Sequence, residues 1–312
     1  MSRYIFLLNR GSGGNERGLD AEQVIDLVKR RFQHAGHELR PLPFPPSGIT
    51  EAIRRAVNER PDGIIAGGGD GTVSAVARAL GGSAITLGVL PMGTFNLAAR
   101  DFGVPMDIGD AARFLATEAR EKQIDVLDVN GRYCLCMTLL GFYPAYARTF
   151  ERRDHGGRWW RKAAKVVAAL PRSFRQARPL QLRWQGVDIV PGGARTKFCA
   201  FVPGRFESSV GLVPRRATFQ SGKLTAYVGL QRKPAAAVRA MVDFMAGKQE
   251  ENPELLTIET PEMTLHNERR KHTVSMIDGE VTRLDFPIQL RILPQHLRVL
   301  AAPGASEAGT AK

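Results

Sequence analysis

The six residues Gly67-Gly68-Gly69-Asp70-Gly71-Thr72 decide the fold class of this 312-residue chain. They follow the apolar segment 63–66 and precede residues 73–80, whose apolar side chains recur at helical spacing. This order predicts a strand, a glycine-rich loop and the start of a helix. Glycines let a backbone approach phosphate oxygens closely, and the N–H groups at a helix start bind anions. Because Asp70 would repel a bare phosphate, a cation or a hydroxyl group must lie between them, which indicates nucleotide chemistry with Mg²⁺.

Two further segments repeat this arrangement of an apolar strand followed by a loop of small residues. The loop residues suited to contact a nucleotide are Asn9, Ser12 and Gly13 after residues 4–8, and Gly93, Thr94 and Asn96 after residues 87–92. Three such strand ends are typical of the carboxyl edge of a parallel sheet, where open α/β folds bind ligands. The loops match neither a Walker A sequence nor a dinucleotide fingerprint.

The pattern of the chain changes near Asp125. Up to that point short apolar strands alternate with amphipathic helices, which predicts a parallel α/β domain over residues 1–125. Residues 126–287 contain short strand-like segments separated by Gly, Pro and polar turns, which predicts an antiparallel β-sandwich. Two helical stretches, 159–174 and 235–245, interrupt this second domain. The small and polar residues 301–312 are predicted to be disordered.

Six motifs, taken in chain order, resemble the catalytic domain shared by diacylglycerol, sphingosine and ceramide kinases in its bacterial soluble form. They are Asn9, Ser12-Gly13, residues 68–72, Pro91-x-Gly93-Thr94-x-Asn96, Ile124-Asp125 and Ile277-Asp278-Gly279-Glu280. The resemblance covers nearly the whole chain. It implies an ATP-binding α/β domain, a β-sandwich that takes the lipid substrate, and an active site in the cleft between the two. It also implies that residues 288–300 return to the first domain.

The resemblance gives each candidate residue a role. The nucleotide is expected at Asn9, Ser12, Gly13, Gly68, Gly69, Gly71, Thr72, Gly93, Thr94 and Asn96. Asp70 and Asp125 are the candidate Mg²⁺ residues, since Mg²⁺ prefers a few carboxylates together with water and phosphate oxygens.

The motif around Gly279 supplies the candidate base. Alternation would place Asp278 and Glu280 on the same side of an extended segment. The local sequence Asp-Gly is typical of a turn. The resemblance instead implies that this segment meets Asp70 across the cleft. Asp278 is therefore predicted to be the general base, with Glu280 orienting it or the cation, and Asp70 is the competing base.

Three positions depart from the pattern of the resembled family. The family usually has Asp where this chain has Leu97, Asn where it has Cys136, and Asp-Gly where it has Ser221-Gly222. Leu97 removes one acidic residue from the expected Mg²⁺ network, and Ser221 disfavours a structural cation at its site. Activity is still predicted because the four carboxylates named above remain.

The net charge of +13 is unevenly distributed. Between Arg148 and Arg183 stand eleven basic residues and two acidic ones. This local excess, with a basic amphipathic helix predicted over residues 159–170, favours contact with anionic headgroups at a membrane surface. The alternative is a helix that packs on its own domain with a solvated basic side. Nucleic acid is not expected, because no nucleic-acid-binding motif occurs.

The cysteines and the hydropathy pattern indicate a cytoplasmic protein. Three cysteines suit a reducing compartment, and Cys134-x-Cys136 reads as buried thiols rather than a metal pair. The N-terminus lacks the apolar core of a signal peptide, and no run of about 18 apolar residues occurs. Any membrane contact is therefore expected to be peripheral. The oligomeric state, including a homodimer, is left open.

Three functions follow from these features. The first is an ATP- and Mg²⁺-dependent kinase that phosphorylates a hydroxyl group of diacylglycerol or a related lipid. The second is a kinase of a soluble substrate on the related scaffold of NAD kinases, which share a Gly-Gly-Asp-Gly loop. The third is a nucleotide- or lipid-binding protein that is catalytically weak because of Leu97. No motif identifies the lipid.

Overall fold

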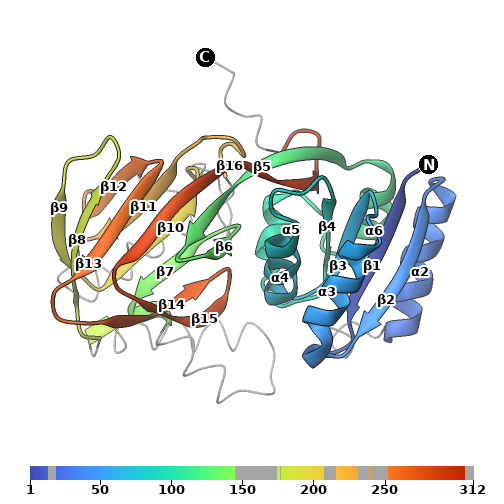
Figure 1. Cartoon of the computed structure of the whole chain (residues 1–312), viewed down its shortest axis with the longest axis horizontal. Coiled ribbons are helices and arrows are strands. Elements are labelled where there is room, and N and C mark those ends of the chain that lie inside the picture. The colour runs from blue at the N-terminus through green and yellow to red at the C-terminus, as the bar shows by residue number, and fades with distance from the viewer. Residues whose placement is uncertain are drawn as a thin grey trace. The chain divides into compact units, whose positions relative to one another are not determined.

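The computed structural model describes residues 1–12, 19–144, 174–175, 177–206, 216–230, 239, 243 and 252–305. The chain divides into two compact units, whose elements are labelled in Figure 1. Unit 1 comprises Met1–Val126, Ala217–Gln220 and Leu293–Lys312, and unit 2 comprises Leu127–Arg216 and Ser221–Ile292. Gly13, the two helices predicted over 159–174 and 235–245, and most of the basic segment between Arg148 and Arg183 lie outside the described residues, apart from single positions.

Unit 1 is built on a parallel sheet. Its strands are β1 (Arg3–Asn9), β2 (Glu38–Phe44), β3 (Gly63–Gly68) and β4 (Thr86–Pro91), in the spatial order β2-β1-β3-β4. The later strand β16 (Ile288–Ala301) adds to β4 in parallel, and β5 (Arg120–Val129) pairs with β16. Strands β3 and β4 are buried throughout, as expected of a parallel sheet that is covered on both faces.

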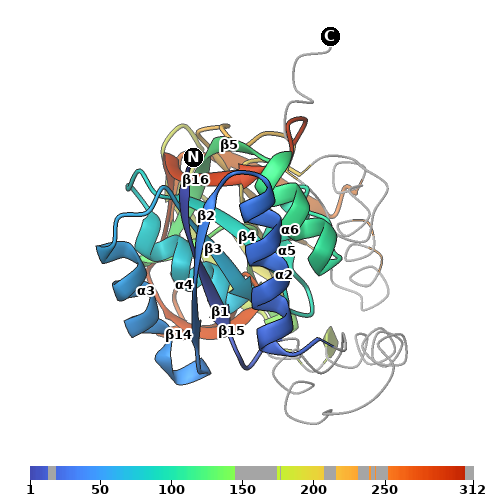
Figure 2. The same ribbon diagram turned by 90° about the vertical axis from the view of Figure 1, so that its right-hand side faces the viewer.

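Helices cover the two faces of this sheet, as Figure 2 shows. They are α2 (Ala21–His34), α3 (Ile49–Asn58) after the 3₁₀ turn η1 (Pro46–Gly48), α4 (Asp70–Leu80), α5 (Leu97–Asp101) and α6 (Ile108–Thr117). Helix α2 packs against α6, and α3 packs against α4. Helix α2 begins at a capping box in which Asp20 and Gln23 bond each other's backbone N–H groups. It buries Val24, Val28 and Phe32 along one side.

The strand order places a topological switch point between β1 and β3. The chain leaves β1 toward one edge through α2 to β2, and then crosses back through α3 to β3. At such a point the loops at the carboxyl ends of the strands diverge and leave room for a ligand. The last residues of these strands are Asn9 and Gly68, so the predicted glycine loops begin at this position.

Unit 2 contains two antiparallel sheets. The first contains β6 (Arg132–Cys134), β8 (Leu180–Gly186), β9 (Gly192–Thr196), β13 (Glu262–Asn267) and the first part of β16. The second has the order β12 (Leu255–Thr260), β11 (Leu224–Gly229), β10 (Phe198–Pro203), β7 (Thr138–Gly141), β14 (His272–Ile277) and β15 (Glu280–Asp285). One core combines Leu182 and Trp184 of the first sheet with Phe201 and Val228 of the second.

The architecture confirms the predicted fold class, with a parallel α/β unit followed by an antiparallel β-sandwich. Strand β16 belongs to unit 2 up to Ile292 and to unit 1 from Leu293 onward. Ala301 is still part of this strand, and residues 303–305 form a turn. No helix within the described ranges is long and apolar enough to cross a membrane.

Candidate functional site

The loop after β1 is tied to the first turn of α4. Asn9 donates its side-chain N–H to Thr72 Oγ1 at 3.1 Å and accepts the backbone N–H of Gly11 at 3.0 Å. Ser12 donates its backbone N–H to the Asn9 carbonyl at 3.0 Å. Thr72 is 5% exposed, so its hydroxyl group accepts the hydrogen bond from Asn9 beneath the surface of the loop. The structure therefore brings these three predicted residues together at one edge of the sheet.

The two glycine loops contact each other through their backbones. A Cβ atom on Gly93 would lie 2.6 Å from the Cα atom of Gly69. A Cβ atom on Gly68 would lie 2.5 Å from Thr72 Oγ1. Real side chains do not tolerate such distances, so the loops need glycine at positions 68 and 93 in order to pack. Gly71 follows in the first turn of α4 and is half-buried.

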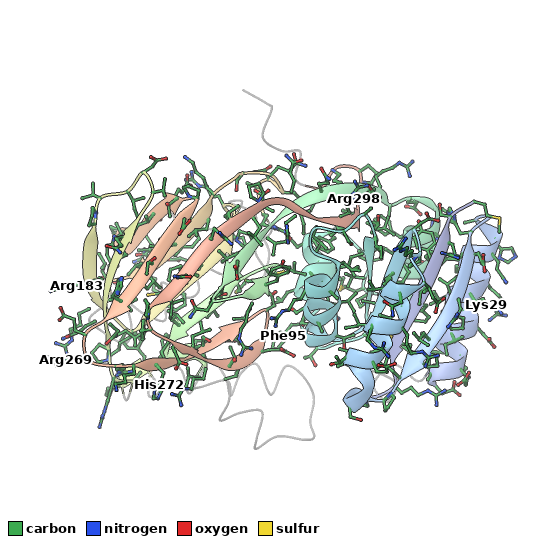
Figure 3. All side chains as sticks on the ribbon, viewed as in Figure 1. Lys29, Phe95, Arg183, Arg269, His272 and Arg298 are labelled. Carbon is green, nitrogen blue, oxygen red and sulfur yellow. The ribbon has the colours of Figure 1, made fainter. Side chains whose placement is uncertain are left out.

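The side chain of Asn96 closes the second loop. Its oxygen accepts the N–H of Gly93 and its nitrogen donates to the carbonyl of Gly93, both at 2.8 Å. Asn96 adopts the left-handed conformation with φ of 51° and is 5% exposed. Asparagine tolerates this conformation better than most residues. Thr94 and Phe95 at the tip of the loop are exposed, and Figure 3 labels Phe95.

Asp70 links the two glycine loops. It is the first residue of α4, and its carboxylate accepts the backbone N–H groups of Asn96 at 3.0 Å and Leu97 at 2.7 Å. A carboxylate is favoured here by the positive end of the α4 dipole and by the N–H groups at the start of α5, which have no acceptor within that helix. Asp70 is half-buried and therefore partly accessible to solvent.

Asp125 has a different environment. It lies in β5, is 2% exposed, and accepts the backbone N–H of Gln295 in β16 at 2.9 Å. Its own N–H donates to the carbonyl of Phe219 at 2.8 Å. These contacts attach both returning segments of unit 1, residues 217–220 and 293–301, to β5.

Asp278 and Gly279 form the two-residue turn of the β14–β15 hairpin. Both have positive φ, 47° and 89°, and the flanking Ile277 and Glu280 are paired directly. The expectation of an extended segment with Asp278 and Glu280 on one side is therefore wrong. Asp-Gly is a strong signal for a tight hairpin turn, and this preference overrides simple alternation. Asp278 is turned inward and 3% exposed, whereas Glu280 is exposed.

The carboxylate of Asp278 holds the loop before β7. It accepts the backbone N–H groups of Leu135 at 2.7 Å, Cys136 at 2.8 Å and Met137 at 3.1 Å. The thiol of Cys134 lies 3.4 Å from the same carboxylate. Burial raises the pKa of Asp278 above its usual value, although the three N–H groups act in the opposite direction. The contact at Cys136 uses the backbone, so the unusual side chain at this position does not remove it.

Ser221 and the cysteines, which the sequence disfavours as cation ligands, have simple local roles. Ser221 exchanges hydrogen bonds with the backbone of Lys223, accepting its N–H at 3.2 Å and donating to its carbonyl at 2.8 Å. Cys134 and Cys136 are buried free thiols, as is Cys199. Within the described ranges, no group of three or more His, Cys, Asp or Glu side chains is placed to hold a metal ion.

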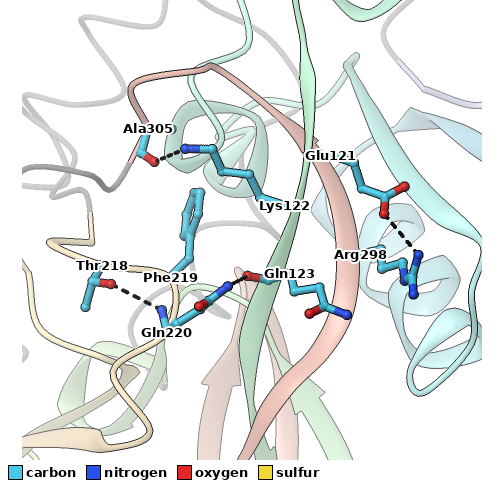
Figure 4. Close-up of a pocket in the computed structure, with 8 residues that line it drawn as sticks. All are labelled: Glu121, Lys122, Gln123, Thr218, Phe219, Gln220, Arg298 and Ala305. Atoms are coloured by element: carbon cyan, nitrogen blue, oxygen red, sulfur yellow. Dashed lines mark hydrogen bonds and ion pairs between the residues drawn. The ribbon is translucent and has the colours of Figure 1, made fainter.

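A hollow of about 680 Å³ lies in unit 1, away from the glycine loops in sequence (Figure 4). Its residues are Glu121, Lys122, Gln123, Thr218, Phe219, Gln220, Arg298 and Ala305. Glu121 pairs with Arg298 at 3.1 Å, and Lys122 donates to the carbonyls of Pro303 and Ala305 at 2.8 Å each. These bonds connect β5, β16 and residues 303–305 of unit 1 around the hollow.

Comparison with known proteins matches unit 1 to a kinase domain. Residues 3–129 match the family model of the diacylglycerol kinase catalytic domain. A protein from Klebsiella pneumoniae named "Probable lipid kinase YegS-like" is 43% identical over 134 residues, which are 40% of this chain and 41% of the relative. The diacylglycerol kinase of Bacillus subtilis is 36% identical over 109 residues, which are 34% and 36% of the two chains. The alignments thus span about two fifths of the length of these relatives.

The fold comparison extends over both units. A crystal structure of a diacylglycerol kinase from Bacillus anthracis superposes with a TM-score of 0.70, covering 97% of this chain and 98% of that one at 20% identity. At this identity the likeness establishes the fold. The resemblance that the motifs indicate is therefore confirmed: this chain is similar to lipid kinases with a diacylglycerol kinase catalytic domain, in sequence over residues 3–129 and in fold over nearly its whole length.

Proposed function

We propose that this protein is an ATP- and Mg²⁺-dependent lipid kinase that transfers the γ-phosphate to a hydroxyl group of diacylglycerol or a related lipid. The observation that carries the proposal is the pair of interlocked glycine loops with Asp70 between them. The first loop follows β3 at the switch point of the sheet and the second follows the neighbouring strand β4. Both lie within the residues that match the kinase domain model.

The nucleotide phosphates would lie over the start of α4. This helix has 11 residues, and its first N–H groups and dipole favour an anion. The half-buried Gly69 and Gly71 keep the backbone accessible there, and the buried Gly68 leaves room for Thr72. The exposed Thr94 and the half-buried Ser12 offer hydroxyl groups. Asn9, Thr72 and Asn96 support this arrangement by holding the loops, since their side chains bond the loops themselves.

The carboxylate of Asp70 suits a Mg²⁺ ion that is held mainly by phosphate oxygens and water, which is the usual environment of this ion. The carboxylate accepts the N–H groups of Asn96 and Leu97, and the half-buried residue remains partly accessible to a metal-bound water. Bound there, Mg²⁺ would neutralise charge on the phosphates. We assign the main role to Asp70, because Asp125 is 2% exposed and its carboxylate accepts the Gln295 N–H.

We propose Asp278 as the general base, with Glu280 as the accessible carboxylate on the same hairpin and Asp70 as the competing base. A group that is 3% exposed must become accessible before it can take a proton from a lipid hydroxyl. Its raised pKa supports the assignment, because a base works best when its pKa is close to the operating pH. The lipid would be reached by peripheral contact with a cytoplasmic membrane surface.

The test is transfer of labelled phosphate. The protein is incubated with γ-labelled ATP and Mg²⁺, first with vesicles made from a total lipid extract and then with NAD as a soluble acceptor. Label on diacylglycerol or another lipid supports the proposal, and Asp70→Asn should lower the rate of labelling about a hundredfold or more. Label on NAD alone identifies a soluble-substrate kinase. Nucleotide binding without any transfer identifies a binding protein that does not turn over.

A further inference from the structure

Four arginines surround one hollow on unit 2. The hollow has a volume of about 390 Å³, and its lining consists of Arg178, Pro179, Gln181, Arg195, Asn267, Arg269 and Arg270. We call it the arginine pocket. Figure 3 labels Arg269 near Arg183 and His272 along one edge of this unit. Neither the glycine loops nor the Asp278 turn contributes to the lining.

The sheet places two of the lining residues side by side. Gln181 of β8 and Arg195 of β9 are direct partners in the antiparallel ladder. The neighbours Leu180 and Leu182 are buried in the sandwich core. Because side chains alternate along a strand, Gln181 and Arg195 lie on the outer face of the sheet.

The turn after β13 holds the other arginines in place. Asn267 accepts the backbone N–H groups of Arg269 and Arg270, both at 3.0 Å. The guanidinium group of Arg270 donates to the carbonyls of Arg178 at 3.2 Å and Pro179 at 3.4 Å. The turn is thereby fastened to the segment that enters β8. The pocket is therefore held together by the backbone and not only by flexible side chains.

The polar lining consists almost entirely of donors. Among the described residues it contains four guanidinium groups and no carboxylate. Glu268, the acidic residue beside the turn, pairs with Arg183 at 2.8 Å. The side-chain nitrogen of Asn267 is buried without an acceptor, which adds an unmet donor. The pKa of the nearby Lys197 is lowered mainly by burial and further by the positive charge of Arg195, so positive charges repel one another here.

We propose that the arginine pocket binds a phosphate group, carried by a phospholipid headgroup or by a free phosphate ester. Guanidinium groups bind phosphate through paired hydrogen bonds, and a phosphate offers only acceptors and a negative charge. One such group would relieve the repulsion among the four arginines. This site lies in the described part of unit 2, and it does not depend on the proposed kinase activity.

The test compares two double variants that lose the same charge. Arg195→Gln/Arg269→Gln removes two exposed arginines of the pocket and leaves Arg270, which bonds the backbone. Arg30→Gln/Arg55→Gln removes two exposed arginines from α2 and α3 as the matched control. Thermal melting verifies that both variants fold. Binding is measured by sedimentation with phosphatidylcholine vesicles that contain phosphatidylglycerol, and by calorimetry with glycerol 3-phosphate.

The pocket variant should bind the anionic vesicles or glycerol 3-phosphate about thirtyfold more weakly than the wild type, as expected for the loss of two cations at an anionic surface. The control variant should bind within about threefold of the wild type. Loss with vesicles alone assigns the site to a lipid headgroup, and loss with glycerol 3-phosphate assigns it to a free ester. Equal losses in both variants, unchanged binding in the pocket variant, or a wild type that binds neither probe would overturn the proposal.

Discussion

The carboxylate of Asp70 accepts the backbone N–H of Leu97 at 2.7 Å. Through this bond the first residue of α4 fixes the first residue of α5. The resembled kinases usually carry an acidic side chain at the position of Leu97. In this chain the link uses only the backbone of Leu97, so it does not depend on that side chain. The altered residue therefore leaves the junction of the two glycine loops intact.

Asp70→Asn should reduce both turnover and stability. In the amide, an NH₂ donor replaces one of the two oxygens that accept the N–H groups of Asn96 and Leu97, and the side chain carries no charge for the cation. We expect kcat to fall about a hundredfold or more, and the free energy of unfolding to fall by about 1–2 kcal/mol. Kinase assays and urea unfolding measure the two effects. Asp26→Asn, on the exposed side of α2, is the control. A kcat near that of the wild type would remove Asp70 from the mechanism.

Gly93→Ala and Gly69→Ala should differ sharply. The added methyl group at position 93 would lie 2.6 Å from the Gly69 backbone, whereas at position 69 its nearest neighbour is Gly93 Cα at 3.7 Å. We expect Gly93→Ala to cost about 1–3 kcal/mol of unfolding free energy through overpacking, and Gly69→Ala to cost under about 1 kcal/mol. Thermal unfolding of the two variants measures the difference. Equal losses would show that the loops do not pack as described.

The parallel sheet could be predicted because its signals are local. Glycine loops directly follow apolar strands, and each helix shows its own periodicity. The return of residues 217–220 to unit 1 could not be predicted in this way. It rests on contacts between residues far apart in the sequence: the N–H of Asp125 bonds the carbonyl of Phe219, and the Phe219 ring packs edge-on against Phe102. No local periodicity in the sequence indicates which distant segments meet in this way.

The candidate site was predictable in its residues more than in its geometry. The motifs identified Asp278, but alternation gave the wrong conformation, because Asp and Gly both tolerate positive φ and form the turn. The arginine pocket was not predictable, since strand register and one turn bring together Arg178, Arg195 and Arg269 from separate segments. Only the three-dimensional pairing shows that these charges share one hollow.

The three cysteines should resist modification in the folded protein. All are buried, and burial raises the pKa of Cys199 to about 12 and that of Cys134 well above its usual value. A thiol reacts as the thiolate, which is therefore scarce at neutral pH. Iodoacetamide at pH 8 should label none of the three in native protein and all three in guanidinium chloride, as measured by mass spectrometry. Rapid labelling of the native protein would contradict the buried placement.

Asp278 should make stability depend on pH. Its pKa in the folded protein is raised above the ordinary value of 3.8, chiefly by burial. Its contribution to the unfolding free energy is therefore fully present below pH 3.8 and is lost as the pH rises through the folded-state pKa. The advantage of wild type over Asp278→Asn should accordingly shrink from acid to neutral pH in urea unfolding. An advantage that grows over this range would mean that the N–H groups of residues 135–137 outweigh burial.

Asp278→Asn and Glu280→Gln separate the two carboxylates of the hairpin in catalysis. If Asp278 is the base, Asp278→Asn should bind ATP with little change and lose lipid phosphorylation, because only the acceptor hydroxyl depends on it. Glu280→Gln should retain transfer at a reduced rate, since its exposed carboxylate would only orient the base or the cation. Calorimetry measures the binding of ATP, and transfer of labelled phosphate measures the phosphorylation of the lipid. Full transfer by Asp278→Asn, with Asp70→Asn inactive, would make Asp70 the base and leave Asp278 as the residue that holds the loop at Leu135.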